Sequence, residues 1–424
     1  MSWLQTTMGE VCLPTLQKDP TRNGTGSFRY IDISGIDRET KTISGAGYVP
    51  CAEAPSRARK LVQAGDLLVS TVRPNLNAVA IVPEELDGEI ASTGFCVLRA
   101  NRRLAVPSYL LYRVRHQEFV DFLVANATGA TYPAVSDGVV RRAPLPLPSL
   151  SEQAHIVELL DEADRLRRLC READAKAARI LSALFLRMFG APETWVNTRN
   201  LGQIVHMKSG GTPSKSVPEY WVGPTPWVSP KDMKSDVIED AEDHISESAV
   251  QSSATQVVPE GSILIVVRGM ILARDVPLAI TRARVAINQD MKALMLTDDR
   301  LTPLFLFAVL KALAARLLRE VTTAAHGTKK LETNRLESLP IPLPSGERIA
   351  RFTAVYEALS VIDRKRSALA LRIDHLFSLL LSRAFSGQLT AKWREAQMRE
   401  LLAEMQEQAR LLGLPLPWEM EAVR

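Results

Sequence analysis

Hydrophobic and small residues recur at helical spacing through residues 151–188. Their intervals alternate between four and three, a pattern typical of a helix with a coiled-coil seam and incompatible with a strand. The residues of this predicted seam are Leu159, Ala163, Leu166, Cys170, Ala173, Ala177, Ile180 and Leu184. About 37 residues at 1.5 Å each make a rod on the order of 55 Å long. One domain cannot cover such a rod, so we expect it to pack against a partner helix.

The same pattern returns 196 positions later in the chain. The second predicted seam consists of Val355, Leu359, Ile362, Arg366, Leu369, Ile373, Leu376 and Leu380. Two unrelated amphipathic helices, each lying on its own domain, would not predict a shared register. A connection of one domain's length between the helices lets them pair in opposite directions.

A repeat at nearly the same offset extends beyond these helices. Gly65–Val69 corresponds to Gly261–Ile265, and Pro107 corresponds to Pro303, each proline opening a predicted helix. Short apolar runs bounded by turn residues predict strands. In the first half these runs are 30–33, 67–72, 78–82 and 95–98, and in the second half they are 263–267, 278–280, 285–287 and 293–296.

These elements predict an α+β fold that arose by internal duplication, with two mixed, strand-rich domains joined by a long antiparallel helical coiled coil. We expect a first domain at 1–147, a spacer helix at 148–190, a second domain at 191–344, a second spacer helix at 345–386 and a helical tail at 387–424. The Leu-Pro-Leu-Pro and Ile-Pro-Leu-Pro stretches before the helices should form stiff, extended exits.

The tail predicts one amphipathic helix with Met398, Leu402, Met405 and Leu412 on one side. Packing back onto the helix pair and docking to a partner are equally compatible with this pattern.

Composition narrows the functional classes. The 424 residues are 46% hydrophobic and 24% charged, as in globular proteins, and the net charge is only +4. Residues 191–345 carry 17 basic and 17 acidic side chains, so any contact with nucleic acid must come from local clusters. The first residues lack a signal-peptide pattern and no apolar run is long enough to span a membrane, so we expect a cytoplasmic location. Four widely spaced cysteines indicate neither zinc nor disulfides.

No sequence motif indicates an active site. Nucleotide-binding glycine motifs, HExxH and the Asn/Asp-Pro-Pro-aromatic sequence of adenine methyltransferases are all missing from the chain. The triplet Glu39-Thr40-Lys41 fits part of a nuclease pattern, but such triplets occur by accident. We expect no catalytic residue and no metal site.

Several segments resemble the specificity subunit of type I restriction-modification systems. These are APLPLPSLSEQAHIVELLDEADRLRR (143–168), its echo LPIPLPSGERIARFTAVYEALSVIDRKR (339–366), SGGTPSKSVPEYWVGPTPWVSPKDM (209–233) and FSGQLTAKWRE (385–395). The second copy departs from the first at Gly346-Glu347-Arg348, where the first has Leu150-Ser151-Glu152-Gln153.

The resemblance implies a DNA-specificity subunit of a type I restriction-modification complex. Each target-recognition domain would read one half of a bipartite, asymmetric site in double-stranded DNA, while the helices fix the spacing and dock two methylation subunits. It implies no cofactor on this chain. S-adenosylmethionine would be bound by the methylation subunits, and ATP and Mg by motor-nuclease subunits.

Residues that could contact DNA occur in the polar loops of both halves. The candidates are Arg29, Tyr30, Arg73, Thr131, Tyr132, Thr212, Ser214, Lys215, Lys231, Arg268, Arg274, Lys329 and Lys330. Trp221 and Trp227 fit a small core of their own loop better than base contact. We expect the acidic segment 236–247 to point away from DNA.

Two other functional classes remain open. A coiled-coil adaptor that binds two proteins would show no sequence-dependent retention on DNA. A stand-alone DNA-modifying enzyme would transfer methyl groups or cleave DNA as the purified chain.

Overall fold

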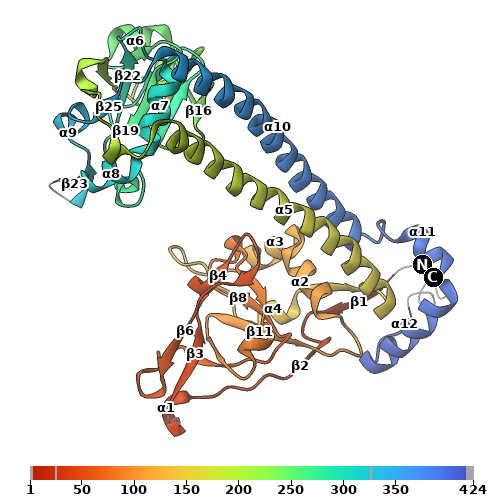
Figure 1. Ribbon diagram of the computed structural model, residues 1–424. Helices are drawn as coiled ribbons and strands as arrows, with labels where there is room; N and C mark the ends of the chain where they lie inside the picture. The colour runs from red at the N-terminus through yellow and green to blue at the C-terminus, as the bar shows by residue number, and fades with distance from the viewer. Residues whose placement is uncertain (1–2, 24–25, 325–326, 417–424) are drawn as a thin grey trace. The chain divides into compact units, whose positions relative to one another are not determined.

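The computed structural model describes residues 3–23, 26–324 and 327–416. The chain forms two compact units, Met1–Arg171 with Ala368–Arg424, and Glu172–Ser367. Each unit contains one strand-rich domain and a segment of both long helices, α5 (Leu150–Phe189) and α10 (Gly346–Phe385) (Figure 1).

The first unit is built from small, mostly antiparallel sheets. Their strand orders are β1 (Leu4–Thr7)-β12 (Pro144–Leu147), β6 (Ala46–Pro50)-β3 (Ser27–Ile31)-β10 (Ile90–Ser92)-β7 (Ala58–Leu61), β2 (Cys12–Leu13)-β11 (Phe95–Ala100)-β8 (Leu67–Ser70)-β9 (Val79–Ile81), and β4 (Ile36–Asp37)-β5 (Thr42–Ile43). Its other helices are α1 (Pro20–Asn23), α2 (Pro107–Arg115), α3 (Gln117–Ala125), α4 (Asp137–Arg142), α11 (Ala391–Ala396) and α12 (Met398–Leu412).

The second unit repeats this plan. Its strand orders are β13 (Thr198–Asn200)-β25 (Pro340–Pro342), β14 (Val205–Ser209)-β22 (Met291–Leu296)-β19 (Ile263–Val266)-β20 (Leu278–Thr281)-β16 (Val237–Ile238), β17 (Asp243–Ile245)-β15 (Thr225–Val228)-β21 (Val285–Ile287)-β18 (Gln256–Val258), and β23 (Thr322–Thr323)-β24 (Lys329–Lys330). Its remaining helices are α6 (Glu247–Ser252), α7 (Pro303–Ala312), α8 (Ala314–Arg319) and α9 (Thr333–Glu337).

The predicted duplication is confirmed. β11 and β22 begin 196 positions apart, as do α2 and α7, and α5 and α10 share both boundaries at that offset. All eight predicted strands overlap observed ones. The sequence missed the remaining strands, because most of them are short or carry polar residues and glycines.

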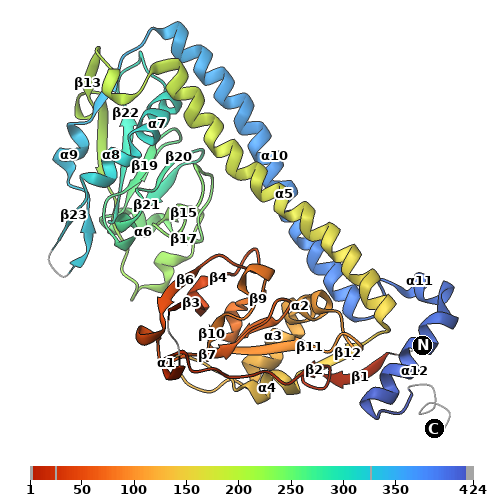
Figure 2. The same ribbon diagram turned by 60° about the horizontal axis from the view of Figure 1, so that its bottom comes forward.

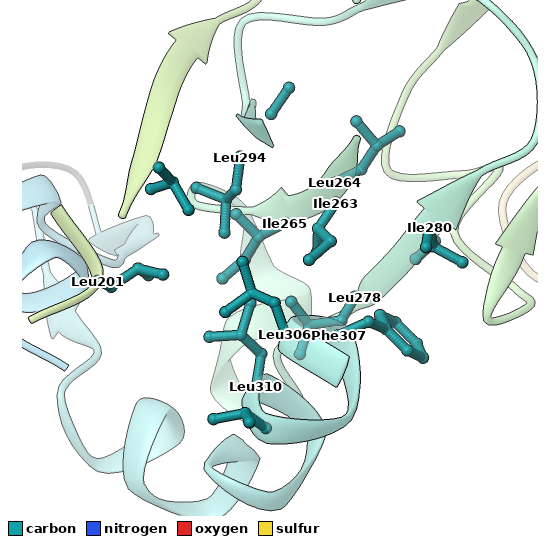
Figure 3. Packing of buried hydrophobic residues seen from close by; sticks show 14 of the residues in the cluster. Leu201, Ile263, Leu264, Ile265, Leu278, Ile280, Leu294, Leu306, Phe307 and Leu310 are labelled. Atoms are coloured by element: carbon teal, nitrogen blue, oxygen red, sulfur yellow. The ribbon is translucent and has the colours of Figure 1, made fainter. Parts of the chain in front are cut away.

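The core of the second domain lies between one helix and its central strands. Leu306 and Leu310 of α7 are directed toward Ile263 and Ile265 of β19 (Figure 3). All four side chains are fully buried or nearly so. Truncating one of them to alanine typically costs about 2–5 kcal/mol of stability.

The proline-rich stretches before α5 and α10 are paired strands and not unpaired connections. β12 pairs with β1, and β25 pairs with β13, in antiparallel ladders. Prolines alternate with residues that keep their amide N–H, so a two-stranded ladder tolerates them. The prediction of extended backbone was right, but the strands close each domain onto its own beginning.

In each unit, the segments of α5 and α10 lie side by side (Figures 1 and 2). In the second unit they run antiparallel, since Arg348 contacts Met188 while Arg366 contacts Asp174. In the first unit Arg167 contacts Asp374.

The predicted seam is wrong for one of its two rows of residues. The exposed row consists of Leu159, Leu166, Ala173 and Ile180 on α5 and Val355, Ile362, Leu369 and Leu376 on α10. The other predicted row is mostly half-buried, and consists of Ala163, Cys170, Ala177 and Leu184 with Leu359, Arg366, Ile373 and Leu380. The second inward row lies one residue later, at Leu160, Arg167, Asp174 and Leu181 on α5 and at Tyr356, Asp363, Ala370 and Phe377 on α10.

Charged residues explain this error. Arg167 and Asp174 stand in the inward row of α5, where they form ion pairs with α10, so hydrophobic spacing pointed to the neighbouring apolar row instead. The guanidinium of Arg167 lies 4.3 Å from the ring centroid of Phe377. The inward row is therefore apolar where the helices pack against a domain core, at Leu160 and Phe377 and at Leu181 and Tyr356, and it is charged at Arg167 and Asp174.

The tail packs against the first domain as two helices, α11 and α12. Leu401, Met405, Gln408 and Ala409 form the buried side of α12. The predicted apolar face, Met398, Leu402, Met405 and Leu412, shares only Met405 with it, although Leu412 packs partly buried against the same core. The prediction followed apolar side chains, whereas the buried side includes an amide, Gln408. Gln408 donates to the carbonyl oxygens of Leu104 and Pro148. The predicted tail extends to residue 424, beyond the described residues.

Buried Glu152 holds the start of α5 to the tail. Its carboxylate accepts hydrogen bonds from the indole of Trp3 (3.0 Å), the hydroxyl of Thr390 (2.5 Å) and the guanidinium of Arg394 (2.8 Å). A buried charge needs such partners. The FSGQLTAKWRE segment thus completes the first unit.

Candidate nucleic-acid interface

In the first domain, the end of β8 lies against the loop before α4. The backbone N–H of Arg73 donates to the carbonyl of Pro133 at 2.7 Å. Its guanidinium lies 4.6 Å from the ring centroid of Tyr132, which is 65% exposed. Arg73 adopts a left-handed conformation, with φ of 49°, which is uncommon for residues other than glycine. The structure therefore brings together Arg73, Tyr132 and the neighbouring Thr131.

The second domain contains the same junction. The N–H of Gly269 donates to the carbonyl of Lys329 at 3.0 Å, and both positions are 196 residues after Arg73 and Pro133. The adjacent Arg268 pairs with Lys330 in a β-bridge. The ammonium of Lys329 donates to the hydroxyl of Thr323 at 2.8 Å. Arg268, Lys329 and Lys330 thus form one exposed or half-exposed basic cluster, in which the ammonium of Lys330 also lies 2.9 Å from the carboxylate of Glu332.

The glycine-containing loop 209–217 joins this cluster through one short segment, 287–290. Thr212 is hydrogen-bonded to Gln289, and the N–H of Gly211 donates to the carbonyl of Ile287. The carbonyl of Asp290 accepts from the N–H of Arg268 at 3.2 Å. Polar groups of three loops therefore converge at one end of the second domain.

Ser214 and Lys215 lie at the exposed tip of loop 209–217. The hydroxyl of Ser214 is 2.7 Å from that of Ser216, and the Ser214 carbonyl accepts from the indole of Trp221. Trp221 packs edge-on against buried Trp227, with ring centroids 5.1 Å apart. The two tryptophans form the small loop core that the sequence favoured over base contact.

Other candidates lie apart from these junctions. Arg29 and Tyr30 are on β3, in a different sheet from β8, and the Arg29 guanidinium donates to the Glu85 carbonyl at 3.2 Å. Burial raises the pKa of Tyr30. Arg274 is exposed at the end of the short helix after β19.

Lys231 has carboxylate partners of its own. Its ammonium lies 2.9 Å from Asp243 and 3.3 Å from Glu242. The hydrogen bond that it donates to Asp243 raises the pKa of Lys231 most, and the one that it donates to Glu242 raises it further. A lysine that is already neutralised is a weak phosphate anchor, which speaks against Lys231 as a DNA contact.

Sequence reasoning missed three polar residues at these surfaces. Gln289 connects two loops, Lys292 donates to the hydroxyl of Ser209, and Tyr48 on β6 is 75% exposed beside Arg29. Gln289 and Lys292 both lie just before the predicted strand 293–296, and a polar position next to a strand end is the signal that could have identified them.

Within residues 3–23, 26–324 and 327–416, no group of three or more His, Cys, Asp or Glu side chains is arranged to hold a metal ion. No helix in the same ranges is long and apolar enough to cross a membrane.

The chain matches known proteins over most of its length. The family model of the type I restriction modification DNA specificity domain matches it twice, at residues 5–175 and 192–368. The type I restriction enzyme EcoR124I/EcoR124II specificity subunit of Escherichia coli is 29% identical over 235 residues, which are 54% of this chain and 58% of that protein. The chain therefore aligns with little more than half of the length of that relative.

Two further matches cover more of the chain. The HindI specificity subunit of Haemophilus influenzae is 20% identical over 417 residues, 80% of this chain and 89% of that protein. A solved chain from a structure of complex assembly and conformational transition in a type I R-M system is 29% identical, with a TM-score of 0.58 over 92% of this chain and 98% of that one. These matches do not favour the adaptor alternative.

Proposed function

The chain belongs to the type I restriction modification DNA specificity family, and we propose that it is the subunit through which such a complex reads its DNA sequence. Each strand-rich domain reads one half of a bipartite, asymmetric site in double-stranded DNA.

The repeated loop junction is the observation that carries this proposal. The hydrogen bond from residue 73 to residue 133 recurs from residue 269 to residue 329, and each junction carries basic side chains, one in the first domain and three in the second. The backbone of the two junctions is alike while the side chains differ: Arg73, Thr131 and Tyr132 in one, Arg268, Lys329 and Lys330 in the other. Two similar scaffolds with different donors suit the reading of two different sequences.

The helix pair separates and supports the two readers in this proposal. α5 and α10 form an antiparallel coiled coil of fixed length, and their exposed apolar row docks methylation subunits. Leu166 and Leu376, 44% and 54% exposed, and Ile362, 58% exposed, support this role. Large apolar side chains in a row on an ion-paired rod indicate a protein-protein contact.

In this proposal the methylation and cleavage reactions are catalysed by partner subunits. We propose that this chain is non-catalytic and holds no cofactor, that methylation subunits supply S-adenosylmethionine, and that motor-nuclease subunits use ATP and Mg. The relatives named above are subunits of type I restriction enzymes, which supports these partners.

Half-site selection by single-site variants tests the reading function. We expect Arg73→Gln to relax selection in one half of the site and Arg268→Gln to relax it in the other, with about 1–3 kcal/mol lost per base contact. The complete complex would be bound to duplexes with either half randomised, and retained duplexes sequenced. Relaxation of both halves by one variant, or of neither half by both variants, contradicts the assignment.

A further inference from the structure

A cavity rich in cations lies between the first domain and the helix pair. Its volume is about 670 Å³, and Arg38, Lys41, Arg115, Arg167 and Arg171 line it, with Glu39 and Glu118 as the acidic members. All belong to the first unit. We call it the Lys41 cavity.

Three of the arginines have carboxylate partners. Arg115 and Arg167 share Asp164, at 2.8 and 3.1 Å. Arg167 also contacts Asp374, which lies 3.9 Å from Arg171. Three guanidinium groups therefore share two carboxylates. A third carboxylate, that of Glu118, is engaged by Arg113.

Lys41 and Arg38 add positive charge to this cluster. Among the described residues, no carboxylate lies within ion-pair distance of either side chain. The ammonium of Lys41 donates instead to the carbonyl of Asn77 at 2.7 Å. The β4–β5 turn places Lys41 in a left-handed conformation, with φ of 58° and its N–H bonded to the Asp37 carbonyl.

The surroundings of Lys41 disfavour its charge. Burial, followed by the charges of Arg115 and Arg167, lowers the pKa of Lys41 to about 8. An anion in the cavity would offset both effects.

The second unit shows that this excess charge is not required by the fold. Its corresponding cavity contains three arginines, Arg282, Arg364 and Arg366, but also four carboxylates, Asp236, Glu239, Glu357 and Asp363. Asp363 and Ser367 stand 196 positions after Arg167 and Arg171. Val237 stands 196 positions after Lys41, and Lys311, 196 positions after Arg115, is paired with Asp236 at 2.6 Å. The same junction is thus neutralised in one repeat and cationic in the other.

We propose that the Lys41 cavity binds a phosphate group of the DNA backbone, independently of sequence, in the stretch between the two half-sites. This inference rests on the proposed function. Cations on the β4–β5 loop, on α2 and on α5 converge on one volume, which suits a phosphate better than a planar base edge. It also makes DNA contact at this junction a property of the first repeat alone.

Lys41→Gln in the full chain, assembled with its methylation subunits, tests the proposal. Neutralising one phosphate contributes about 0.9 to the slope of log affinity against log salt. We expect that slope to fall by about 0.9, so that the affinity ratio of wild type to variant changes about 3.5-fold between 50 and 200 mM salt. The loss should be equal on cognate duplexes and on duplexes with altered half-sites.

A neutral backbone linkage identifies the partner phosphate. Single methylphosphonate linkages placed along the spacer should weaken wild-type binding at one or two positions, and those positions should become silent in the Lys41→Gln variant. Lys392→Gln, an exposed charge change of the same size on α11, is the control and should preserve both the slope and the sensitive positions. The melting temperature of Lys41→Gln should equal or exceed that of wild type.

Three outcomes overturn the inference. The first is an unchanged salt slope, and the second is retention of methylphosphonate sensitivity in the Lys41→Gln variant. The third is that inorganic phosphate stabilises wild type but not Lys41→Gln while DNA binding is unaffected, which would make a free anion the occupant. If wild type itself shows no sequence-dependent binding, the proposed function fails instead.

Discussion

Replacing Asp164 by asparagine tests the finding that ion pairs hold the helix pair to the first domain. The carboxylate of Asp164 is 13% exposed and pairs with Arg115, which is only 6% exposed, at 2.8 Å. The substitution leaves the Arg115 guanidinium buried without its carboxylate. Breaking a buried pair costs about 3–5 kcal/mol. We expect about 3 kcal/mol, since Arg115 keeps its contact with the ring of Phe377 at 4.9 Å.

Thermal unfolding measures this effect. For a unit of this size, about 3 kcal/mol corresponds to a melting temperature about 6–12 °C lower. Glu162→Gln is a matched control on the same helix, because Glu162 also pairs with an arginine three residues away, Arg165, but both side chains are more than half exposed. The control should leave the melting temperature unchanged.

The pH dependence gives a second readout. Burial alone would raise the pKa of Asp164, but the hydrogen bond and charge of Arg115, with that of Arg167, hold it below its usual value. A carboxyl whose pKa is lowered by folding stabilises the protein above its unfolded pKa, about 3.9. That stability is lost as pH falls through the folded pKa. The difference between wild type and Asp164→Asn should therefore shrink below about pH 4. Equal effects of both substitutions, or a difference that persists at pH 2, would refute the reasoning.

Three further predictions concern the surfaces. Lys231→Gln should leave DNA affinity and its salt dependence unchanged, because two neighbouring carboxylates already bind the ammonium; a smaller salt slope would place Lys231 at the DNA. Leu166→Asp with Leu376→Asp should preserve the melting temperature of the free chain but weaken assembly with methylation subunits by at least tenfold in a titration, and undiminished assembly would exclude this docking surface. Deleting residues 171–177 and 363–369 together should shorten both helices by about 10 Å and the mapped spacing by about three base pairs at 3.4 Å each, with both half-sequences unchanged; a changed half-sequence would contradict the spacer role.

The repeat was predictable because it recurs at positions where the fold allows few residue types. Strands β8 and β19, and the prolines that open α2 and α7, follow from buried apolar runs and from backbone geometry that few residues allow. Such signals depend on local sequence, so they can be recognised without knowledge of tertiary contacts.

The helix seam was only half predictable, for a physical reason. Hydrophobic spacing identifies the most apolar row of a helix, and Leu159 and Leu166 belong to it, yet both are exposed. The inward row contains Arg167 and Asp174, whose burial depends on partners about 200 residues away. A single sequence does not reveal such partners.

The sequence predicted which loops form the candidate interface, but it did not predict which side chains contact one another there. Arg73 and Tyr132 were both chosen from loops, but their cation–π contact arises from the bridge between Val72 and Ala134. Lys231 looked like a phosphate anchor because its partners, Glu242 and Asp243, are brought back by the pairing of β15 with β17. The Lys41 cavity forms where the β4–β5 turn, α2, α5 and α10 meet. No local sequence pattern indicates this meeting.

The DNA-reading role of the two domains can be measured by mapping methylated positions in DNA from cells that carry the complete system. We expect methylation within two short, different half-sequences separated by a constant number of unspecified base pairs, and exchange of the second domain should change one half-sequence only. Methylation within one uninterrupted sequence, or a pattern that is unchanged when this chain is removed, would contradict that role.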